Sequence, residues 1–178
     1  MSYKLDSKNI IKIGIALGLV IVSGFLKINI PFLPVTLLIA FIIFNALYFD
    51  KIVSRYSIIL YVVLGLIGFP VFANGGGFAY VFKPSFGFII GYIVCTLFIS
   101  GFKDRINLYL SVFIGLILLY IVGGIYMFIM LDYLLGMTLT LFVTNILYLV
   151  GLFVKDIFLC LISILLYKRL VNYKYKSN

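Results

Sequence analysis

Apolar segments separated by short clusters of charged residues, glycine and proline constrain this chain more than any other feature of its sequence. A helix needs about 20 mostly apolar residues to cross the hydrocarbon core of a bilayer. Because 65% of the residues are hydrophobic and 11% are charged, the pattern predicts an all-α integral membrane protein, a compact bundle of about six transmembrane helices. The apolar segments lie near residues 9–27, 35–49, 56–68, 84–102 and 106–131, with a final one ending at Tyr167.

A length of 178 residues has room for about six spans and short connections. It predicts one transmembrane domain over residues 1–178, with no soluble ATPase domain. The segment from Asp132 to Val154 is apolar but contains Thr138, Thr144 and Asn145, and we interpret it as a re-entrant or short interfacial stretch. A seventh span there would move the basic C-terminal tail outside the cell, against the positive-inside tendency.

The basic residues support six spans with both termini in the cytoplasm. This topology places every one of the 14 basic residues except Lys27, Lys83 and Lys155 on the cytoplasmic side. It also accounts for the net charge of +9 without nucleic-acid binding, because the lysines are scattered through short loops of an apolar chain.

The segment from Gly65 to Tyr92 breaks the apolar pattern with glycine, proline and asparagine. Irregular backbone at membrane depth is tolerated where it is buried in protein or lines a cavity, so the break predicts a pocket. An ordinary external loop and an interfacial belt of aromatic residues are the alternatives. Eight aromatic residues surround the glycines and suit a largely apolar pocket: Phe69, Phe72, Phe78, Tyr80, Phe82, Phe86, Phe88 and Tyr92.

Motifs in this segment resemble those of the BioY family, the biotin-binding S components of energy-coupling factor (ECF) transporters. The family pattern G-x-P-V-F-A, a glycine cluster and P-x-x-G-x-x-x-G-[FY] is matched by Gly68, Pro70, Val71, Phe72, Ala73, Gly75 to Gly77, Pro84, Gly87, Gly91 and Tyr92. Leu38 stands in place of a family glutamine. A family pattern P-G-D-x-x-K followed by a basic pair corresponds to residues 154–159, 168 and 169, where only Asp156 and the pair Lys168 and Arg169 match and Leu159 replaces the lysine.

The resemblance implies a site on the outer side that binds biotin as the transported ligand, with no resident cofactor. Asp156 is expected to accept hydrogen bonds from the ureido N–H groups. Lys155 is favoured for the carboxylate, with Lys83 or the backbone N–H groups of the glycines as alternatives. Since Lys155 and Asp156 are adjacent and cannot share one helix face, their positions do not imply a local ion pair. The predicted site residues are Asn74, Gly75, Gly76, Gly77, Tyr80, Lys83, Phe88, Tyr92, Lys155 and Asp156.

The resemblance also implies the plasma membrane of a prokaryote and three partners: a transmembrane coupling subunit and two cytoplasmic ATPase subunits. Gly14-x-x-x-Gly18 on the first helix suits close contact with such a partner or packing within the bundle. An enzyme is not expected, since the chain has no histidine, no glutamate and no nucleotide-binding motif. An S component for lipoate and a membrane protein that keeps the fold without transport remain alternatives.

Overall fold

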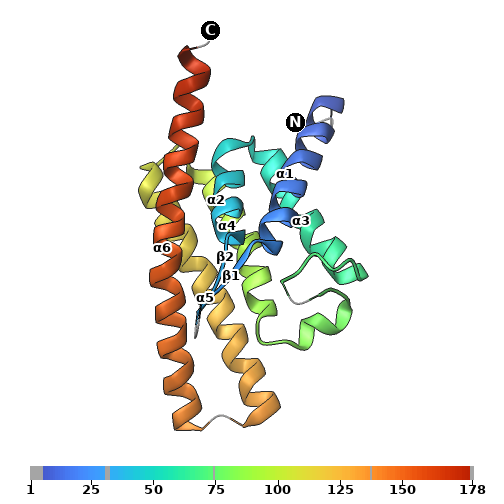
Figure 1. Ribbon diagram of the computed structural model, residues 1–178, viewed down its shortest axis with the longest axis vertical. Helices are drawn as coiled ribbons and strands as arrows, with labels where there is room; N and C mark the ends of the chain where they lie inside the picture. The colour runs from blue at the N-terminus through green and yellow to red at the C-terminus, as the bar shows by residue number, and fades with distance from the viewer. Residues whose placement is uncertain (1–5, 31–32, 74, 137, 177–178) are drawn as a thin grey trace.

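Six α-helices make up most of the chain in the computed structural model, which describes residues 6–30, 33–73, 75–136 and 138–176 (Figure 1). Two short strands and a 3-10 helix lie in the connections. The predicted helical bundle is therefore confirmed. The elements are α1 (Ser7–Phe25), β1 (Lys27–Ile30), β2 (Leu33–Thr36), α2 (Leu38–Tyr48), α3 (Lys51–Ile67), η1 (Phe78–Phe82), α4 (Phe86–Phe102), α5 (Leu108–Leu135) and α6 (Leu139–Lys176).

The helices differ in their relation to the membrane. By length and composition, α1, α5 and α6 can each cross a bilayer. In contrast, α2 has 11 residues, so it is roughly 16 Å long at a rise of about 1.5 Å per residue, about half the hydrocarbon thickness. Most of its side chains are buried, and α2 therefore lies within the bundle instead of facing lipid.

The expectation of a re-entrant or interfacial stretch over residues 132–154 is wrong. Helix α5 continues to Leu135, and α6 begins at Leu139 and runs without interruption to Lys176. The polar side chains of this segment hydrogen-bond to their own helix: Thr144 Oγ1 donates to Thr140 O at 2.7 Å, and Asn145 Nδ2 donates to Leu141 O at 2.8 Å. These residues therefore need no polar surroundings and do not interrupt the helix.

A two-stranded antiparallel hairpin, which the sequence did not predict, connects α1 to α2. Lys27 pairs with Thr36, and Ile30 pairs with Leu33. At the base of the hairpin, Leu37 N donates to Leu26 O at 3.2 Å. The hairpin thereby brings Thr36 and the first turn of α2 to one side of the bundle.

A lysine that directly follows α4 stabilises the end of α2. Lys103, directly after α4, donates from Nζ to the carbonyls of Ala46, Leu47 and Phe49 at 3.1, 2.6 and 2.9 Å. Carbonyls at a helix C-terminus have no partner within the helix, and a cation there also interacts favourably with the helix dipole. Burial lowers the pKa of Lys103, while two nearby aspartates act in the opposite direction.

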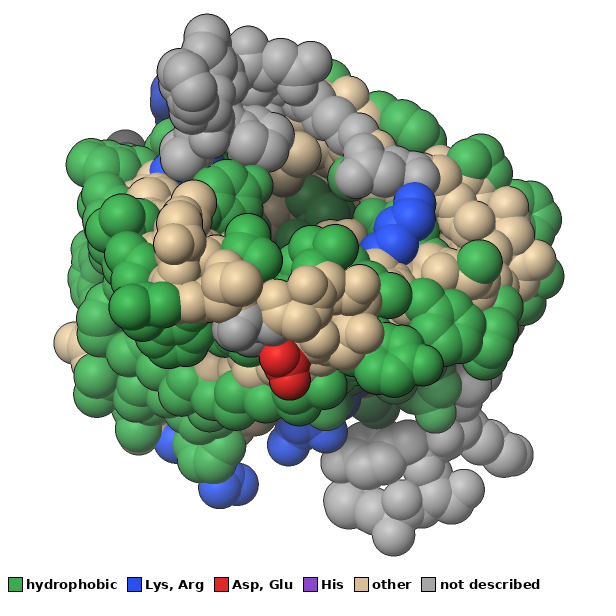
Figure 2. Space-filling view, turned by 90° about the horizontal axis from the view of Figure 1, so that it is seen from below, with side chains coloured by type: hydrophobic (Ala, Val, Ile, Leu, Met, Phe, Trp, Pro, Cys, Tyr) green, Lys and Arg blue, Asp and Glu red, His purple; other side chains and the backbone are tan. Residues whose placement is uncertain are grey.

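The two halves of the bundle differ in what fills them. In the half that contains the start of α1 and the end of α6, four helices pack in an apolar core. This core includes Ile43, Leu47, Ile99, Leu116 and Ile164, none more than 2% exposed. The opposite half is hollowed, and Figure 2 views the molecule from that end, where mostly hydrophobic side chains surround the hollow.

The start of α1 and the end of α6 lie at the same end of the bundle (Figure 1). This arrangement agrees with the expected even number of crossings. Lys12 pairs with Asp50 at 3.2 Å at this end, which also contains Lys103. That this end faces the cytoplasm stays a prediction from the distribution of basic residues.

Candidate ligand-binding site

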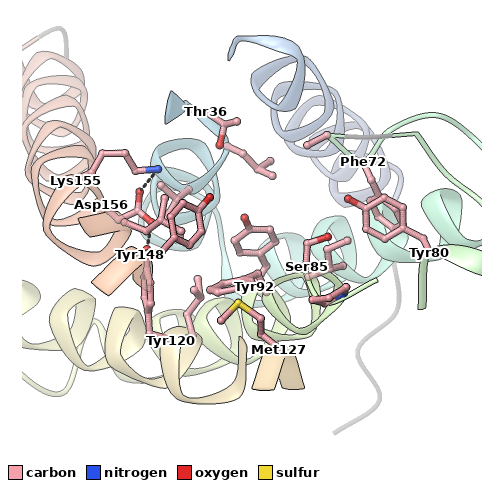
Figure 3. Close-up of a pocket in the computed structure, with 18 of the residues that line it drawn as sticks. Thr36, Phe72, Tyr80, Ser85, Tyr92, Tyr120, Met127, Tyr148, Lys155 and Asp156 are labelled. Carbon is pink, nitrogen blue, oxygen red and sulfur yellow. Dashed lines mark hydrogen bonds and ion pairs between the residues drawn. The ribbon is translucent and has the colours of Figure 1, made fainter. Parts of the chain in front are cut away.

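A cavity of about 580 Å³ occupies the hollow half of the bundle (Figure 3). Its volume falls within the range of roughly 300 to 1,000 Å³ that is usual for small-molecule sites. Helices α2 to α6, the end of β2 and the loop between α3 and α4 all contribute to its wall. The lining residues are Thr36, Leu38, Ile39, Tyr61, Phe72, Ala73, Tyr80, Pro84, Ser85, Phe88, Ile89, Tyr92, Leu119, Tyr120, Met127, Tyr148, Leu152, Lys155 and Asp156.

A polar cluster from α5 and α6 interrupts this largely apolar wall. Tyr120 Oη donates a 2.6 Å hydrogen bond to Asp156 Oδ2, and Lys155 Nζ lies 3.0 Å from Asp156 Oδ1 (Figure 3). Asp156 is 7% exposed, and its Oδ1 contacts the Lys155 ammonium but no other described donor, so one of its two lone pairs remains available. A buried carboxylate oxygen with this unused capacity is suited to accept a hydrogen bond from a ligand N–H group.

Lys155 and Asp156 form an ion pair that their adjacent positions did not imply. Adjacent Cα atoms point to different faces of a helix, but the flexible four-carbon stem of a lysine lets its ammonium reach a neighbouring carboxylate. Both side chains are largely buried, 15% and 10% exposed. An ammonium and a carboxylate are thus presented together at the wall of the cavity.

Five of the predicted site residues lie together on this wall: Tyr80, Phe88, Tyr92, Lys155 and Asp156. The other predicted residues differ in their placement. Gly75, Gly76, Gly77 and Lys83 are not among the residues that line the cavity, and Asn74 lies outside the described residues. Lys83 Nζ lies 4.6 Å from the centre of the Tyr80 ring, a cation–π distance.

The glycines shape the loop that carries Phe72 and Tyr80. Gly75 and Gly77 have φ angles of 106° and 103°, which favour glycine. Gly75 N donates to Phe72 O at 3.1 Å and Gly77 N donates to Gly65 O at 2.7 Å. Because these two N–H groups already have acceptors, they are not free to bind a ligand carboxylate.

The same loop directs aromatic rings toward the cavity. Phe72 is 1% exposed and Tyr80 is 4% exposed. The Phe72 ring lies between Tyr61, at a centroid distance of 5.5 Å, and Tyr80, at 4.8 Å. Tyr126 on α5 donates from its hydroxyl to Val81 O and so ties η1 to the bundle. These contacts hold the aromatic side of the wall in place.

Several lining residues were not predicted. Tyr120 and Met127 lie within the long apolar segment of α5, where no change in composition distinguishes them from residues that face lipid. Tyr148 lies in the segment wrongly expected to be re-entrant. A tyrosine hydroxyl inside an apolar helix needs a partner, and this was the available signal for Tyr120.

The two leucines that depart from the family pattern occupy different places. Leu38 lines the cavity at the first turn of α2. Leu159 is 7% exposed and packs in the apolar core; it is not among the lining residues. Among the described residues, no group of three His, Cys, Asp or Glu side chains could hold a metal ion.

Comparison with known proteins places this geometry in context. The chain matches the BioY family over residues 1–174. It is 32% identical to a probable biotin transporter BioY of Lysinibacillus sphaericus, over 91% of this chain and 86% of the relative. It is 30% identical to a probable biotin transporter BioY of Pyrococcus horikoshii, over 69% of this chain and 76% of that relative.

Two solved structures are similar in fold. The crystal structure of the S-component for biotin from an ECF-type ABC transporter aligns with a TM-score of 0.65 and 25% identity, covering 94% of this chain and 95% of that one. The S component of a bacterial ECF transporter aligns with a TM-score of 0.58 and 21% identity, covering 93% and 96%. The second likeness concerns the fold alone.

Proposed function

Because this chain belongs to the BioY family, we propose that it is the substrate-capture subunit of an ECF-type vitamin importer and binds biotin from outside the cell. It is a multi-pass protein of a prokaryotic plasma membrane. Family membership makes it a transport protein and not an enzyme.

The observation that carries the proposal is the buried carboxylate of Asp156, beside an ammonium, in a cavity that is otherwise mostly aromatic and aliphatic. Biotin has a ureido ring with two N–H donors, an apolar bicyclic and valeryl body, and one carboxylate. Oδ1 of Asp156 has the capacity to accept from a ureido N–H. Tyr80, Phe88 and Tyr92 offer apolar surface for the body of the ligand.

Lys155 is our choice for the partner of the biotin carboxylate. Its ammonium is at the cavity wall and has N–H donors beyond its ion pair with Asp156. Lys83, the alternative cation, packs over the Tyr80 ring and is not a lining residue. A ligand carboxylate beside Lys155 would displace solvent from a largely apolar surrounding. A charge-assisted hydrogen bond from the Lys155 ammonium to this carboxylate is strong there.

A second carboxylated vitamin, lipoate, is favoured by one observation. Leu38 contributes an apolar surface to the cavity at the position where the family pattern has a glutamine. Lipoate has an apolar dithiolane ring in place of the ureido group and gives Asp156 no N–H donor. Direct competition between the two ligands therefore separates the candidates.

We also propose that the protein works with a transmembrane coupling subunit and two cytoplasmic ATPase subunits. The feature that supports this is the outer surface of α1. A Cβ atom added at Gly14 or Gly18 meets nothing within 4 Å, so the bundle itself does not use these glycines for close packing. Small residues on an open helix face suit close approach by a partner helix.

The test of the ligand is biotin binding by the purified protein in detergent, measured by calorimetry, with lipoate and thiamine as competitors. Asp156→Asn keeps the shape of the side chain but removes its charge, and we expect at least a tenfold loss of biotin affinity. Asp132→Asn, at the end of α5, is the matched control and should leave the affinity unchanged.

A folded protein that binds lipoate and not biotin would move the assignment to lipoate. Binding of neither ligand, or biotin affinity equal in wild type and Asp156→Asn, would contradict the proposed site. Folding is checked by size-exclusion profile and melting temperature in the same detergent.

A further inference from the structure

A second concave surface lies on the opposite half of the bundle from the cavity. It is an apolar groove of about 430 Å³ between the first turns of α5 and the second half of α6. Leu110, Phe113 and Leu116 form one side, and Ile157, Leu161 and Ile164 form the other. The groove shares no lining residue with the cavity, so ligand capture as proposed above leaves it unexplained.

The groove is open to the surroundings of the bundle. Leu110, Phe113 and Leu161 are 49%, 46% and 44% exposed, on two helices that can each cross a membrane. Along α5 it extends from Asn107 to Leu116, roughly 14 Å at about 1.5 Å per residue. Its occupant is therefore elongated, apolar and present in the membrane.

One end of the groove is polar and basic. Tyr109 lines the groove, and Lys168 Nζ donates to Tyr109 Oη at 2.9 Å and lies 4.6 Å from the centre of its ring. An ammonium has three N–H groups, so donors remain for a second acceptor. Two arginines lie near this end in the sequence: Arg169 follows Lys168, and Arg105 lies in the connection between α4 and α5. That connection also contains one acidic residue, Asp104.

We propose that this groove binds an anionic phospholipid, with one acyl chain between α5 and α6 and the headgroup phosphate at Lys168. The charge complementarity favours this occupant: the groove is apolar along its length and carries an ammonium at one end, as an anionic phospholipid carries a chain and a phosphate. Basic pockets between transmembrane helices on the cytoplasmic side are suited to such headgroups. The site does not depend on which vitamin the cavity binds.

The test compares two lipids with the same palmitoyl and oleoyl chains, phosphatidylglycerol and phosphatidylcholine. Native mass spectrometry of the whole protein in detergent measures how much of each lipid is retained as it is added. We expect phosphatidylglycerol to be retained about fivefold better, which is the size of effect that one basic residue has at an anionic surface. Lys168→Gln should bring the two lipids to equal retention. Lys51→Gln, at the start of α3 and not in the groove, should preserve the preference.

A second pair of variants tests the apolar part of the site. Leu161→Trp fills the groove and should reduce retention of both lipids, whereas Ile162→Trp, on the same helix but not among the lining residues, should not. Leu110→Trp repeats the test from the opposite wall if the first variant does not fold. Equal retention of the two lipids by wild type, or a preference that survives Lys168→Gln, would overturn the proposal. A dimer that Leu161→Trp dissociates would assign the groove to a second copy of the chain instead.

Discussion

Tyr120 binds one oxygen of Asp156, while the other oxygen is left beside Lys155 and the cavity. Removing one partner of a buried ion pair is usually costly, because it leaves an uncompensated charge. Here the three side chains orient one another, and each has a distinct part in the proposed binding of biotin. The carboxylate accepts from the ureido group, the ammonium binds the ligand carboxylate, and the phenol positions Asp156.

Tyr120→Phe tests the positioning part. The change removes the hydrogen bond to Oδ2 and keeps the aromatic ring. We expect biotin affinity to fall at least tenfold, because a hydrogen bond to a charged group contributes about 1.5 to 3 kcal/mol. Tyr133→Phe, on the same helix with its side chain exposed, is the matched control. Calorimetry measures both, and unchanged affinity in Tyr120→Phe would remove this residue from the site.

Lys155→Met tests the choice of cation. We expect this variant to bind biotin at least tenfold more weakly than the wild type. We also expect it to bind biotin and its uncharged amide with equal affinity, because the ammonium that pairs with the ligand carboxylate is absent. Lys83→Met is the comparison and should keep the advantage. The reverse pattern would assign the carboxylate to Lys83.

At the scale of the elements, the loop between α3 and α4 depends on close packing against the end of α3. A Cβ atom added at Gly65 would lie 2.0 Å from Cζ of Phe72, so a larger side chain there must displace a ring that lines the cavity. The loop and the helix are therefore one unit, and a change in the helix affects the ligand site.

Gly65→Ala should destabilise the protein by about 1 to 3 kcal/mol, the usual cost of overpacking, and should weaken ligand binding through Phe72. Gly14→Ala places the same methyl group where nothing lies within 4 Å and serves as the control. Melting temperature in detergent measures the difference. Equal melting temperatures for the two variants would show that the Phe72 ring moves without cost.

The sequence predicts the elements better than it predicts the site. Each of the six described helices overlaps with one of the apolar segments of the sequence, because hydropathy determines which segments are buried in the membrane or in the bundle. The conformation predicted above for residues 132–154 is wrong. Thr144 and Asn145 hydrogen-bond to the backbone of their own helix, α6, and composition does not reveal such contacts. Tyr120 was missed because its contact with Asp156 depends on how α5 and α6 pack. The pairing of Lys155 with Asp156 was not predicted because it depends on the conformation of the lysine side chain.

At the scale of the whole molecule, we propose separate tasks for three features of the described residues: the cavity, the surface of α1 with Gly14 and Gly18, and the groove between α5 and α6. The single domain over residues 1–178 and the cytoplasmic placement of both termini stay predictions. The separation of the features means that each can be altered without the others.

Gly14→Leu combined with Gly18→Leu should reduce co-purification with the coupling subunit severalfold while biotin binding by the isolated protein stays at the wild-type value. The reason is that the two leucines block close approach on a face that the bundle does not cover. Val22→Leu, also exposed on α1, is the control. Loss of biotin binding in the double variant would mean that this face belongs to the bundle's own packing.

The apolar core beneath the cavity has a consequence for the permeability of the membrane to ions. Ile43, Leu47, Ile99 and Leu116 are at most 1% exposed, and they close the bundle between the cavity and the end where α1 begins. Ions and water that enter the cavity meet these close-packed apolar side chains, so we expect a membrane rich in this protein to keep its proton and sodium gradients.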